Sequence, residues 1–382
     1  MPPRVAIIAE KFGGVGGSER FVQEVTERLA ATGHFELHVF ANRWQSQCSA
    51  VTFHRVPRLK FPRFLRPWSF AVLSQYMIRR GSFDLVHSHW PTFKADVFST
   101  HGAPHGMWIR NVRKRRPKLF DRVMMMIDRR MMAGGGNAVF MPVSTLLKER
   151  FQEEFDALPG EWMVVHPGVD AKQFAFSEIS RNEVRRTLGF TSDAFVVLFV
   201  GMNFEAKGLD RLMRGFANLR RAVPTKPMHL VVVGRGNVAK FQKLANELGI
   251  SGDVIFTGAI SGGIERYYSA ADVLGMLSEF ETFCMVVLEA MAASLPVVIG
   301  DQMGVKDLVR DGVNGFVLTD RDEPEVCAER LGCLMDSHLQ KTMGESARVT
   351  AHARGWDQVA DRISRIYAAR MTPLHQEERS LP

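Results

Sequence analysis

The chain has 382 residues, of which 46% are hydrophobic, so it is longer than one ordinary domain and suits two globular domains with their own cores. Its net charge of +8 is uneven, because residues 51–132 hold 17 basic and four acidic side chains, a local +13 that leaves −5 for the remainder. Such a surplus favours an acidic partner there, whether nucleic acid, anionic lipid or a phosphorylated substrate.

Cysteine usage and hydropathy exclude further classes of protein. Four cysteines without Cys-x-x-Cys spacing argue against a zinc site and against disulfides. No apolar run reaches the roughly 18 residues of a membrane span, and residues 1–9 lack both the basic head and the length of a signal peptide. We therefore expect a cytoplasmic protein with reduced thiols and no metal.

The beginning of the chain predicts a strand, a glycine turn, a helix and a strand, at residues 4–10, 13–17, 18–31 and 36–41. A dinucleotide-binding domain begins in the same way, so an NAD-dependent enzyme must be weighed. Against it, Glu19 occupies the position of the third glycine of the fingerprint, and the second strand is followed by Asn42 and Arg43 instead of an acid. Arg43 leaves an NADP-dependent oxidoreductase open as an alternative.

Four histidines accompany the next two predicted strands, at residues 83–91 and 97–106. They are His87, His89, His101 and His105. Alternate histidines on a strand share a face and could form a metal cluster. No carboxylate or thiol pattern nearby supports one, so we expect no metal here.

Two basic segments with aromatic residues follow, at residues 55–68 and 107–132. In the second, residues 121–132 predict a helix with an apolar face, formed by Val123, Met124, Ile127 and Met131. The charged residues largely off that face are Asp121, Arg122, Asp128 and Arg129. This helix either faces a core or lies on an anionic membrane with its basic side chains on the headgroups. No nucleic-acid recognition motif accompanies the charge, so we expect no nucleic-acid partner.

The second half of the chain is more regular. It predicts short apolar strands separated by helix-length segments, at residues 195–201, 228–234, 254–258, 272–277 and 296–300. This alternation predicts a parallel sheet covered on both faces, with ligands at the carboxyl ends of the strands. Lys207, next to Gly208 at a predicted helix start, is placed to meet a phosphate.

Residues 272–300 carry the strongest signal, a strand, a polar loop, a helix and a strand. Thr282 is a candidate N-cap, and the free backbone amides that follow it would suit a phosphate, at Phe283, Cys284 and Met285. Glu281 lies just before this helix, and Glu289 lies about 8 Å further along its axis. Glu281 could accept hydrogen bonds from sugar hydroxyls, and Glu289 from the paired hydroxyls of a ribose.

These segments together resemble a known family. The stretches GGSER, DLVHSH, STHG, HPGVD and AKGLD, followed by the block at residues 281–298, occur in the order found in the retaining glycosyltransferases of family 4. The resemblance implies an α/β protein of the GT-B fold, in which two Rossmann-like domains have parallel sheets that face each other across a cleft. It places an acceptor-binding domain at residues 1–168, to which a helix at 356–371 returns, a nucleotide-sugar domain at 169–355 and a tail at 372–382.

The resemblance also assigns roles to residues. It implies three catalytic residues, which are Glu281, Lys207 and His101, the last facing the donor sugar. The donor-binding set that it implies comprises Gly16, Gly17, Asn203, Thr257, Gly258, Thr282, Phe283, Cys284, Met285 and Glu289. The chain departs from the family in one respect, because Met202 and Ala206 stand where the family carries an arginine. Arg235 is a candidate substitute.

The implied activity is transfer of a sugar from a nucleoside diphosphate donor to a glycan or lipid-linked acceptor, with retention and without a covalent nucleophile, metal or other cofactor. The basic segment at residues 107–132 is similar to that of family members that glucosylate the lipopolysaccharide core. This similarity implies UDP-glucose as donor and peripheral binding to the anionic inner membrane through residues 55–68 and 107–132. A catalytically silent nucleotide-binding assembly partner remains an alternative because the arginine is missing. An Asp-x-Asp pattern within residues 318–323 reads as the start of a helix.

Overall fold

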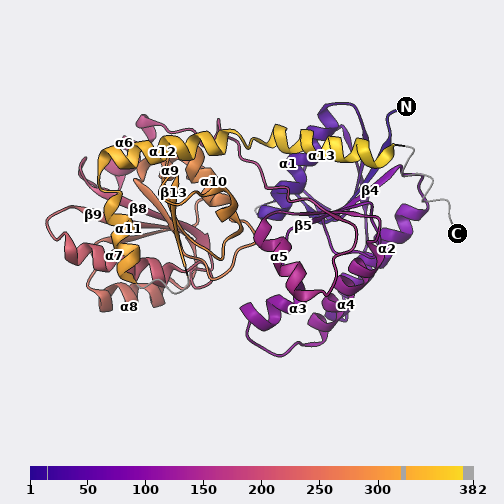
Figure 1. Cartoon of the computed structure of the whole chain (residues 1–382), viewed down its shortest axis with the longest axis horizontal. Coiled ribbons are helices and arrows are strands. Elements are labelled where there is room, and N and C mark those ends of the chain that lie inside the picture. Colours follow the sequence, from indigo (N-terminus) through magenta and orange to yellow (C-terminus); the bar gives the residue numbers. More distant parts are fainter. Residues whose placement is uncertain (15, 320–323, 373–382) are drawn as a thin grey trace. The chain divides into compact units, whose positions relative to one another are not determined.

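The computed structural model describes residues 1–14, 16–319 and 324–372. The chain forms two compact units. One contains Met1–Gly168 and the C-terminal segment from Trp356, and the other is Val169–Gly355 (Figure 1). The division falls at the Pro-Gly turn that ends the first half of the chain. The pattern that was predicted as an Asp-x-Asp helix start, at residues 320–323, lies outside the described residues.

The N-terminal unit is built on a seven-stranded sheet in the order β3-β2-β1-β4-β5-β6-β7, and every pair in it is parallel. The strands are β1 (Arg4–Phe12), β2 (Glu36–Trp44), β3 (Val51–Arg55), β4 (Leu85–Ser88), β5 (Val97–Thr100), β6 (Val139–Pro142) and β7 (Glu161–Trp162). The central strands are apolar along their length because helices cover both faces of a parallel sheet. The sequence analysis did not predict β3, β6 or β7.

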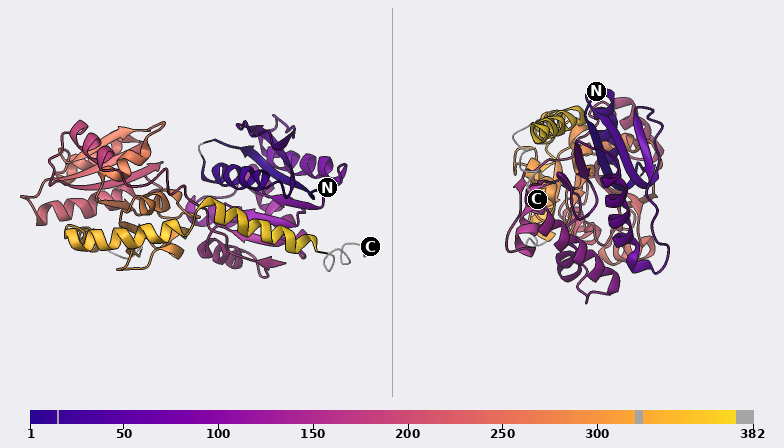
Figure 2. Two further views of the ribbon diagram at one scale, coloured as in Figure 1. Left: turned by 90° about the horizontal axis from the view of Figure 1, so that it is seen from above. Right: turned by 90° about the vertical axis from the view of Figure 1, so that its right-hand side faces the viewer.

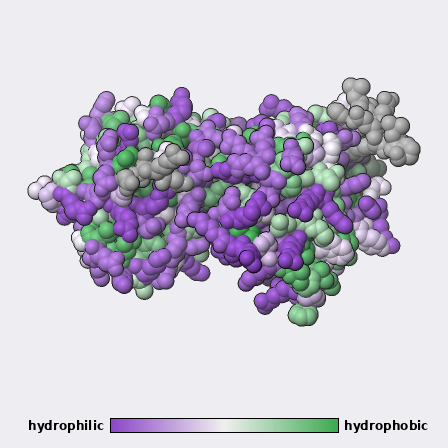
Figure 3. Space-filling view, turned by 60° about the horizontal axis from the view of Figure 1, so that its bottom comes forward, coloured by the Kyte–Doolittle hydropathy of each residue, from purple (hydrophilic) through white to green (hydrophobic). Residues whose placement is uncertain are grey.

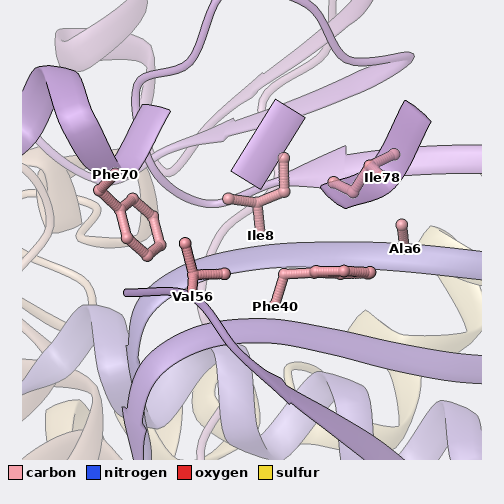
Figure 4. Close-up of a cluster of buried hydrophobic side chains, with 6 residues drawn as sticks. All are labelled: Ala6, Ile8, Phe40, Val56, Phe70 and Ile78. Carbon is pink, nitrogen blue, oxygen red and sulfur yellow. The ribbon is translucent and has the colours of Figure 1, made fainter. Parts of the chain in front are cut away.

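The helices of this unit are α1 (Gly17–Ala31), η1 (Arg63–Leu65), α2 (Arg66–Arg79), α3 (His105–Met107), η2 (Trp108–Val112), α4 (Leu119–Gly134), α5 (Thr145–Glu154) and α13 (Trp356–Met371). One part of the core lies between the sheet and α2 and consists of Ala6, Ile8, Phe40, Val56, Phe70 and Ile78 (Figure 4). All six are at most 7% exposed, so this cluster holds α2 against β1 and β2.

The last helix, α13, packs on the first helix, α1 (Figures 1 and 2). Arg28 of α1 donates a hydrogen bond to Asp357 at 2.7 Å, and the rings of Phe21 and Trp356 meet edge to face at 5.7 Å. Deeper in the unit, the Tyr367 hydroxyl lies 2.6 Å from Nδ1 of His87 in β4. Helix α13 is therefore part of the N-terminal core.

The second unit contains a six-stranded parallel sheet in the order β10-β9-β8-β11-β12-β13. Its strands are β8 (Phe195–Met202), β9 (Met228–Arg235), β10 (Val254–Gly258), β11 (Val273–Met276), β12 (Val297–Gly300) and β13 (Gly315–Leu318). Its helices are α6 (Glu178–Thr187), α7 (Leu209–Ala222), α8 (Val238–Leu248), α9 (Ile264–Ala270), α10 (Met285–Ala292), η3 (Gly304–Leu308), α11 (Pro324–Cys333) and α12 (Ser337–His352). Both sheets are parallel and Rossmann-like, as the α/β GT-B prediction requires.

Helix α4 corrects one detail of the sequence analysis. Met124, Ile127 and Met131 are buried as predicted, but Asp121 and Asp128, which were expected largely off the apolar face, are only 2% and 6% exposed. Both buried carboxylates have partners. Asp121 pairs with Arg115 at 2.6 Å and with the His105 ring at 2.9 Å, and Asp128 accepts from the backbone N–H of His105 at 2.8 Å.

No helix in the described part of the chain combines the length and the hydropathy needed to cross a bilayer.

Candidate active site

The candidate site of the second unit lies where β8 and β11 end. These strands are neighbours in the sheet, so the loops that follow them emerge side by side. The approach is close at Gly208, whose φ is +71°, because a Cβ there would lie 1.9 Å from the carbonyl oxygen of Leu277. Only glycine adopts this conformation in this space without cost. Asn203, at the start of the same loop, also has a left-handed backbone with φ +64°.

This approach brings Lys207 and Glu281 together. The Lys207 ammonium group donates a hydrogen bond to Oε1 of Glu281, and the two form an ion pair although 74 residues separate them. Their side chains are 22% and 19% exposed, so part of the pair is accessible to a ligand. The two residues of this unit for which the resemblance implies a catalytic role are thus in direct contact.

The charge of Lys207 is maintained against burial. Burial lowers the pKa of this amine, but attraction to Cys284 and Glu281, together with the hydrogen bond to Glu281, outweighs it and raises the pKa overall. Burial also raises the pKa of the Cys284 thiol to about 12, so Cys284 is neutral near neutral pH. Glu281 is therefore the anion that stabilises the charge of Lys207. Lys207 therefore presents a full positive charge.

Backbone pairing fixes the loop that carries Glu281. The Glu281 N–H donates to the carbonyl of Gln302 at 3.0 Å, and the Gly304 N–H donates to the carbonyl of Glu281 at 2.9 Å. The Val305 N–H continues the pattern by donating to the carbonyl of Phe283 at 2.9 Å. Glu281 is therefore held by the segment around η3 on one side and by Lys207 on the other.

The start of α10 differs from the prediction. Thr282 is not the N-cap; the cap residue is Cys284, with a left-handed backbone at φ +87°, and the helix begins at Met285. The reason is that residues 281–283 are drawn into the pairing with the segment around η3, which delays the helix by two residues. The helix amides that suit an anion therefore start at Met285 instead of Phe283, and the Val287 N–H already donates to the carbonyl of Cys284 at 3.2 Å.

Glu289 lies inside α10 and is only 7% exposed. Its Oε2 accepts a hydrogen bond from the hydroxyl of Tyr268 in α9 at 2.9 Å, and Tyr268 is fully buried. Sequence reasoning missed Tyr268, because nothing in the chain links α9 to a carboxylate 21 residues later. A buried carboxylate with a fixed hydrogen-bond donor has a defined orientation toward any ligand that it accepts.

The remaining predicted donor contacts lie at the ends of β8, β9 and β10. At the end of β10, Gly258 has φ +77°, and the Thr257 hydroxyl donates to the carbonyl of Gly258 at 3.0 Å. Arg235 ends β9 in register with Met202 of β8, and its side chain is exposed. Among the described residues, Arg235 makes no side-chain hydrogen bond or ion pair, so it remains the candidate for the missing arginine. Ala206 is partly buried.

His101 belongs to the N-terminal unit, at the end of β5. Its Nε2 lies 3.0 Å from Nδ1 of His89, and its ring contacts Phe21 of α1 at a centroid distance of 4.9 Å. Burial lowers the pKa of His101 to about 4, so its imidazole is neutral near neutral pH.

The other histidines are occupied in separate networks. The two ring nitrogens of His87 meet Tyr367 and, at 2.9 Å, the Ser99 hydroxyl, while His105 is paired with Asp121. Over the described ranges, no three His, Cys, Asp or Glu side chains are grouped as metal ligands would be.

Two of the predicted glycines stand at the start of α1. Gly16 is the N-cap of α1 with extended backbone, and Gly17 is the first helical residue. A Cβ on Gly16 would lie 2.1 Å from Oε2 of Glu19, so the absence of a side chain there allows Glu19 to fold over the turn. Val15 lies outside the described residues.

Comparison with known families defines the class of protein. Residues 15–173 match the family model described as Glycosyltransferase Family 4, and residues 180–350 match the one described as Glycosyl transferases group 1. With two Rossmann-like domains, the chain is a glycosyltransferase of the GT-B type. The two matches together cover most of the chain, and the match in the N-terminal unit is to glycosyltransferase family 4. These matches favour transfer chemistry over the oxidoreductase that the first glycine turn left open.

Individual relatives agree with this class. The chain is 29% identical to a D-inositol 3-phosphate glycosyltransferase of Streptomyces griseus, over 96% of this chain and 87% of the relative. It is 28% identical to the enzyme of the same name from Thermomonospora curvata, over 93% and 91%.

Solved structures show the same fold. WaaG, a glycosyltransferase involved in lipopolysaccharide biosynthesis, superposes with a TM-score of 0.78 at 24% identity, over 95% of this chain and 99% of WaaG. HepE of Anabaena, solved in complex with UDP-glucose, superposes with a TM-score of 0.72 at 17% identity, over 96% and 99%.

Proposed function

We propose that the protein is a retaining glycosyltransferase that moves a hexose from a nucleoside diphosphate sugar to a glycan or lipid-linked acceptor. The observation that carries the proposal is the Lys207–Glu281 pair at the ends of β8 and β11, beside the start of α10. A cation beside the N-terminal amides of a helix suits a diphosphate. The structural neighbour solved with UDP-glucose supports UDP-glucose as donor, and the named relatives support a phosphorylated or lipopolysaccharide acceptor.

Catalysis would stabilise the charge on the departing diphosphate. Lys207 and the first amides of α10, at Met285 and Val286, supply this stabilisation from fixed positions, which is effective because they need no reorganisation during the reaction. When the diphosphate takes over the Lys207 ammonium group, Glu281 is released to accept hydrogen bonds from the sugar hydroxyls. Glu289, oriented by Tyr268, accepts from the ribose. His101, which the resemblance implies to be catalytic, is a neutral imidazole in the N-terminal unit, and no residue is assigned as a covalent nucleophile.

The donor is tested by thermal shift with UDP-, GDP- and ADP-sugars, because a ligand that binds only the folded state stabilises it by about 2.7 kcal/mol at about 100 times its Kd. Turnover with the best donor is then measured in Lys207→Ala and Glu281→Ala. We expect kcat to fall about 100-fold or more in each. Lys240→Ala is the matched control, because Lys240 forms an exposed ion pair with Glu205 in the same unit. Unchanged turnover in both site variants would refute the assignment.

We further propose that the protein binds the anionic inner membrane peripherally, through residues 55–68 and 107–132. Two apolar side chains at the start of α4, Leu119 and Phe120, are 53% and 43% exposed. Exposed cations lie close to them in the sequence, namely Arg113, Lys114, Arg116, Lys118 and Arg122. Figure 3 shows hydrophobic side chains next to hydrophilic ones at the lower edge of the N-terminal unit. Each basic residue near an anionic surface contributes about 1 kcal/mol.

Co-sedimentation with vesicles tests the membrane proposal. We expect binding to vesicles that contain phosphatidylglycerol, little binding to phosphatidylcholine, and a loss of binding as salt is added. The double variant Leu119→Ser/Phe120→Ser should bind less, whereas Ile179→Ser, at a 74% exposed site of the second unit, should not. Equal sedimentation with neutral and anionic lipid would refute the proposed binding to an anionic membrane.

A further inference from the structure

The N-terminal unit contains a second candidate site, an open cavity of about 460 Å³ at the ends of β2 and β3. Five basic side chains line it: Arg43, Arg55, Arg58, Lys60 and Arg66. The cavity lies at the carboxyl edge of the sheet, the edge that also carries His101 and the glycine turn before α1. None of these five residues belongs to the donor site of the second unit.

Pairing of β2 with β3 brings the first two cations together. Ala41 pairs in register with Arg55, and Arg43 lies two residues beyond Ala41, so Arg43 and Arg55 leave the same face of the sheet. The turn that follows is anchored by Val56, which is fully buried in the core cluster. Its N–H donates to the carbonyl of Ala41 at 2.8 Å, and its own carbonyl accepts from the Asn42 amide at 3.0 Å.

The opposite wall of the cavity is built from the segment that leads into α2. Arg66, the first residue of α2, donates from Nε and from a terminal nitrogen to the carbonyl of Lys60, at 3.1 and 2.9 Å. The Leu59 N–H donates to the Ser69 hydroxyl at 3.1 Å. These bonds close the segment between Lys60 and Arg66 into a defined loop, so the cavity has fixed walls and is not a flat patch of charge.

The charges in the cavity are not balanced. Arg58 forms an ion pair with Glu10 of β1. Arg66 uses its hydrogen bonds on a neutral carbonyl and keeps its charge uncompensated. Across the part of the chain that the structure describes, Arg43, Arg55 and Lys60 have no side-chain hydrogen bond or ion pair. Cations that converge on one cavity repel each other, and an anion that enters removes this repulsion.

We propose that this cavity binds a phosphate-bearing group, as a site separate from Lys207 and Glu281. Arginine forks match the oxygens of a phosphate, and each phosphomonoester brings about −1.5 to −2 charges, so a diphosphate or two monoesters would neutralise the cavity. Its volume is in the usual range for a small-ligand site. The proposal deepens the proposed function and rests on it only for the source of the phosphate, which is either a soluble phosphorylated acceptor or the headgroup of a lipid-linked one.

Calorimetric titration of the whole protein with inorganic pyrophosphate tests the cavity. Lys207 can also bind this probe, so the titration is made in Lys207→Ala, with and without Arg43→Ala/Arg55→Ala. We expect the Arg43→Ala/Arg55→Ala substitutions to weaken pyrophosphate binding by about tenfold or more for each arginine removed. Arg79→Ala/Arg80→Ala removes the same charge from exposed positions of the same unit and should leave the affinity unchanged. Equal weakening by both pairs would overturn the proposal, since it would show only a diffuse field.

Misfolding is excluded by the Tm measured without any anion, which should be equal or higher in Arg43→Ala/Arg55→Ala because repulsion is removed. Lipid and soluble sources are separated with phosphatidylcholine vesicles that contain phosphatidic acid. If the Arg43→Ala/Arg55→Ala substitutions abolish binding to these vesicles, and the protein without them binds pyrophosphate only weakly, the phosphate is lipid-borne. If the substitutions abolish only pyrophosphate binding, the phosphate is soluble.

Binding of an RNA oligonucleotide with no response to either phosphate probe would overturn the proposal in favour of nucleic acid. UDP-sugar binding is measured in parallel in the chain with an intact Lys207. It should survive the loss of Arg43 and Arg55, so failure of the donor assignment and failure of the cavity assignment are distinguishable.

Discussion

Single side chains in this protein have environments that change their ionisation. Asp128 in α4 is 6% exposed, and burial raises its pKa from 3.8 to about 7. The nearby Glu154 carboxylate adds to the rise, and the His105 N–H opposes it. Asp121, seven residues earlier, behaves in the opposite way: hydrogen bonds from Arg115 and His105 hold its pKa well below its usual range. The same helix thus holds one carboxyl group that is charged near neutral pH and one that titrates there.

The raised pKa of Asp128 predicts a pH-dependent stability. Between pH about 4 and about 7 the folded state holds a proton that the unfolded chain has lost, so stability falls as pH rises, by at most about 1.4 kcal/mol per pH unit, and levels off above pH about 7. Asp128→Asn keeps an acceptor for the His105 N–H but cannot ionise. Urea unfolding should show the variant gaining stability over the natural chain between pH about 5 and about 8. Parallel pH profiles for the two would contradict the assignment.

At the scale of elements, loops and helices are joined by buried polar groups as well as by apolar packing. Asp272, just before β11, accepts hydrogen bonds at 2.7 Å from Arg181 and Arg185 of α6 and from the N–H of Val196 in β8. Asp272 and Arg185 are 6% and 5% exposed. This network holds α6 to the two strands whose loops carry Lys207 and Glu281.

Removing that carboxylate should be costly. Asp272→Ala would leave buried guanidinium groups without their anion, and we expect the free energy of unfolding to fall by about 3–5 kcal/mol. Asp193→Ala is the control, because Asp193 is 60% exposed and faces Lys226 at 4.0 Å, so its loss should change stability by less than about 1 kcal/mol. Chemical unfolding of the whole chain measures both. Equal effects of the two substitutions would show that the Asp272 network is not structural.

At the scale of the whole molecule, the two units are unequal in how the chain builds them. Residues 169–355 form the second unit from one continuous segment, whereas the first unit needs residues 1–168 and the distant helix α13. Trp356 and Tyr367 of that helix are 1% and 0% exposed in the N-terminal core. If α13 is removed, the hydrophobic surface of the first unit that Trp356 and Tyr367 cover becomes exposed.

This difference predicts the behaviour of fragments. The fragment 169–355 should fold alone with a cooperative transition. The fragment 1–168 should be unstable or aggregate, because the sites of Trp356 and Tyr367 would be empty. Joining residues 356–372 to it by a linker, or adding them as a peptide, should restore cooperative unfolding, measured by circular dichroism. A stable fragment 1–168 would mean that α13 is dispensable for that core.

Local sequence determined much of this protein. Strands such as β8, β9 and β10 follow from short continuous apolar runs, the helix α4 follows from an apolar period of 3.6 residues, and motif resemblance singled out Lys207 and Glu281 in advance. These features depend on residues close together in the chain, so the sequence alone exposes them.

Only the tertiary structure decided which distant groups meet. The order of strands places the loops after β8 and β11 side by side, which pairs Lys207 with Glu281 across 74 residues. Pairing with the segment around η3 moves the start of α10 to Met285, and packing of α9 on α10 gives Glu289 its partner Tyr268. The register of β2 with β3 turns Arg43 and Arg55 into one wall of a basic cavity. Such contacts arise from sheet order and register, because hydrogen bonding between strands joins residues without regard to their separation in the sequence.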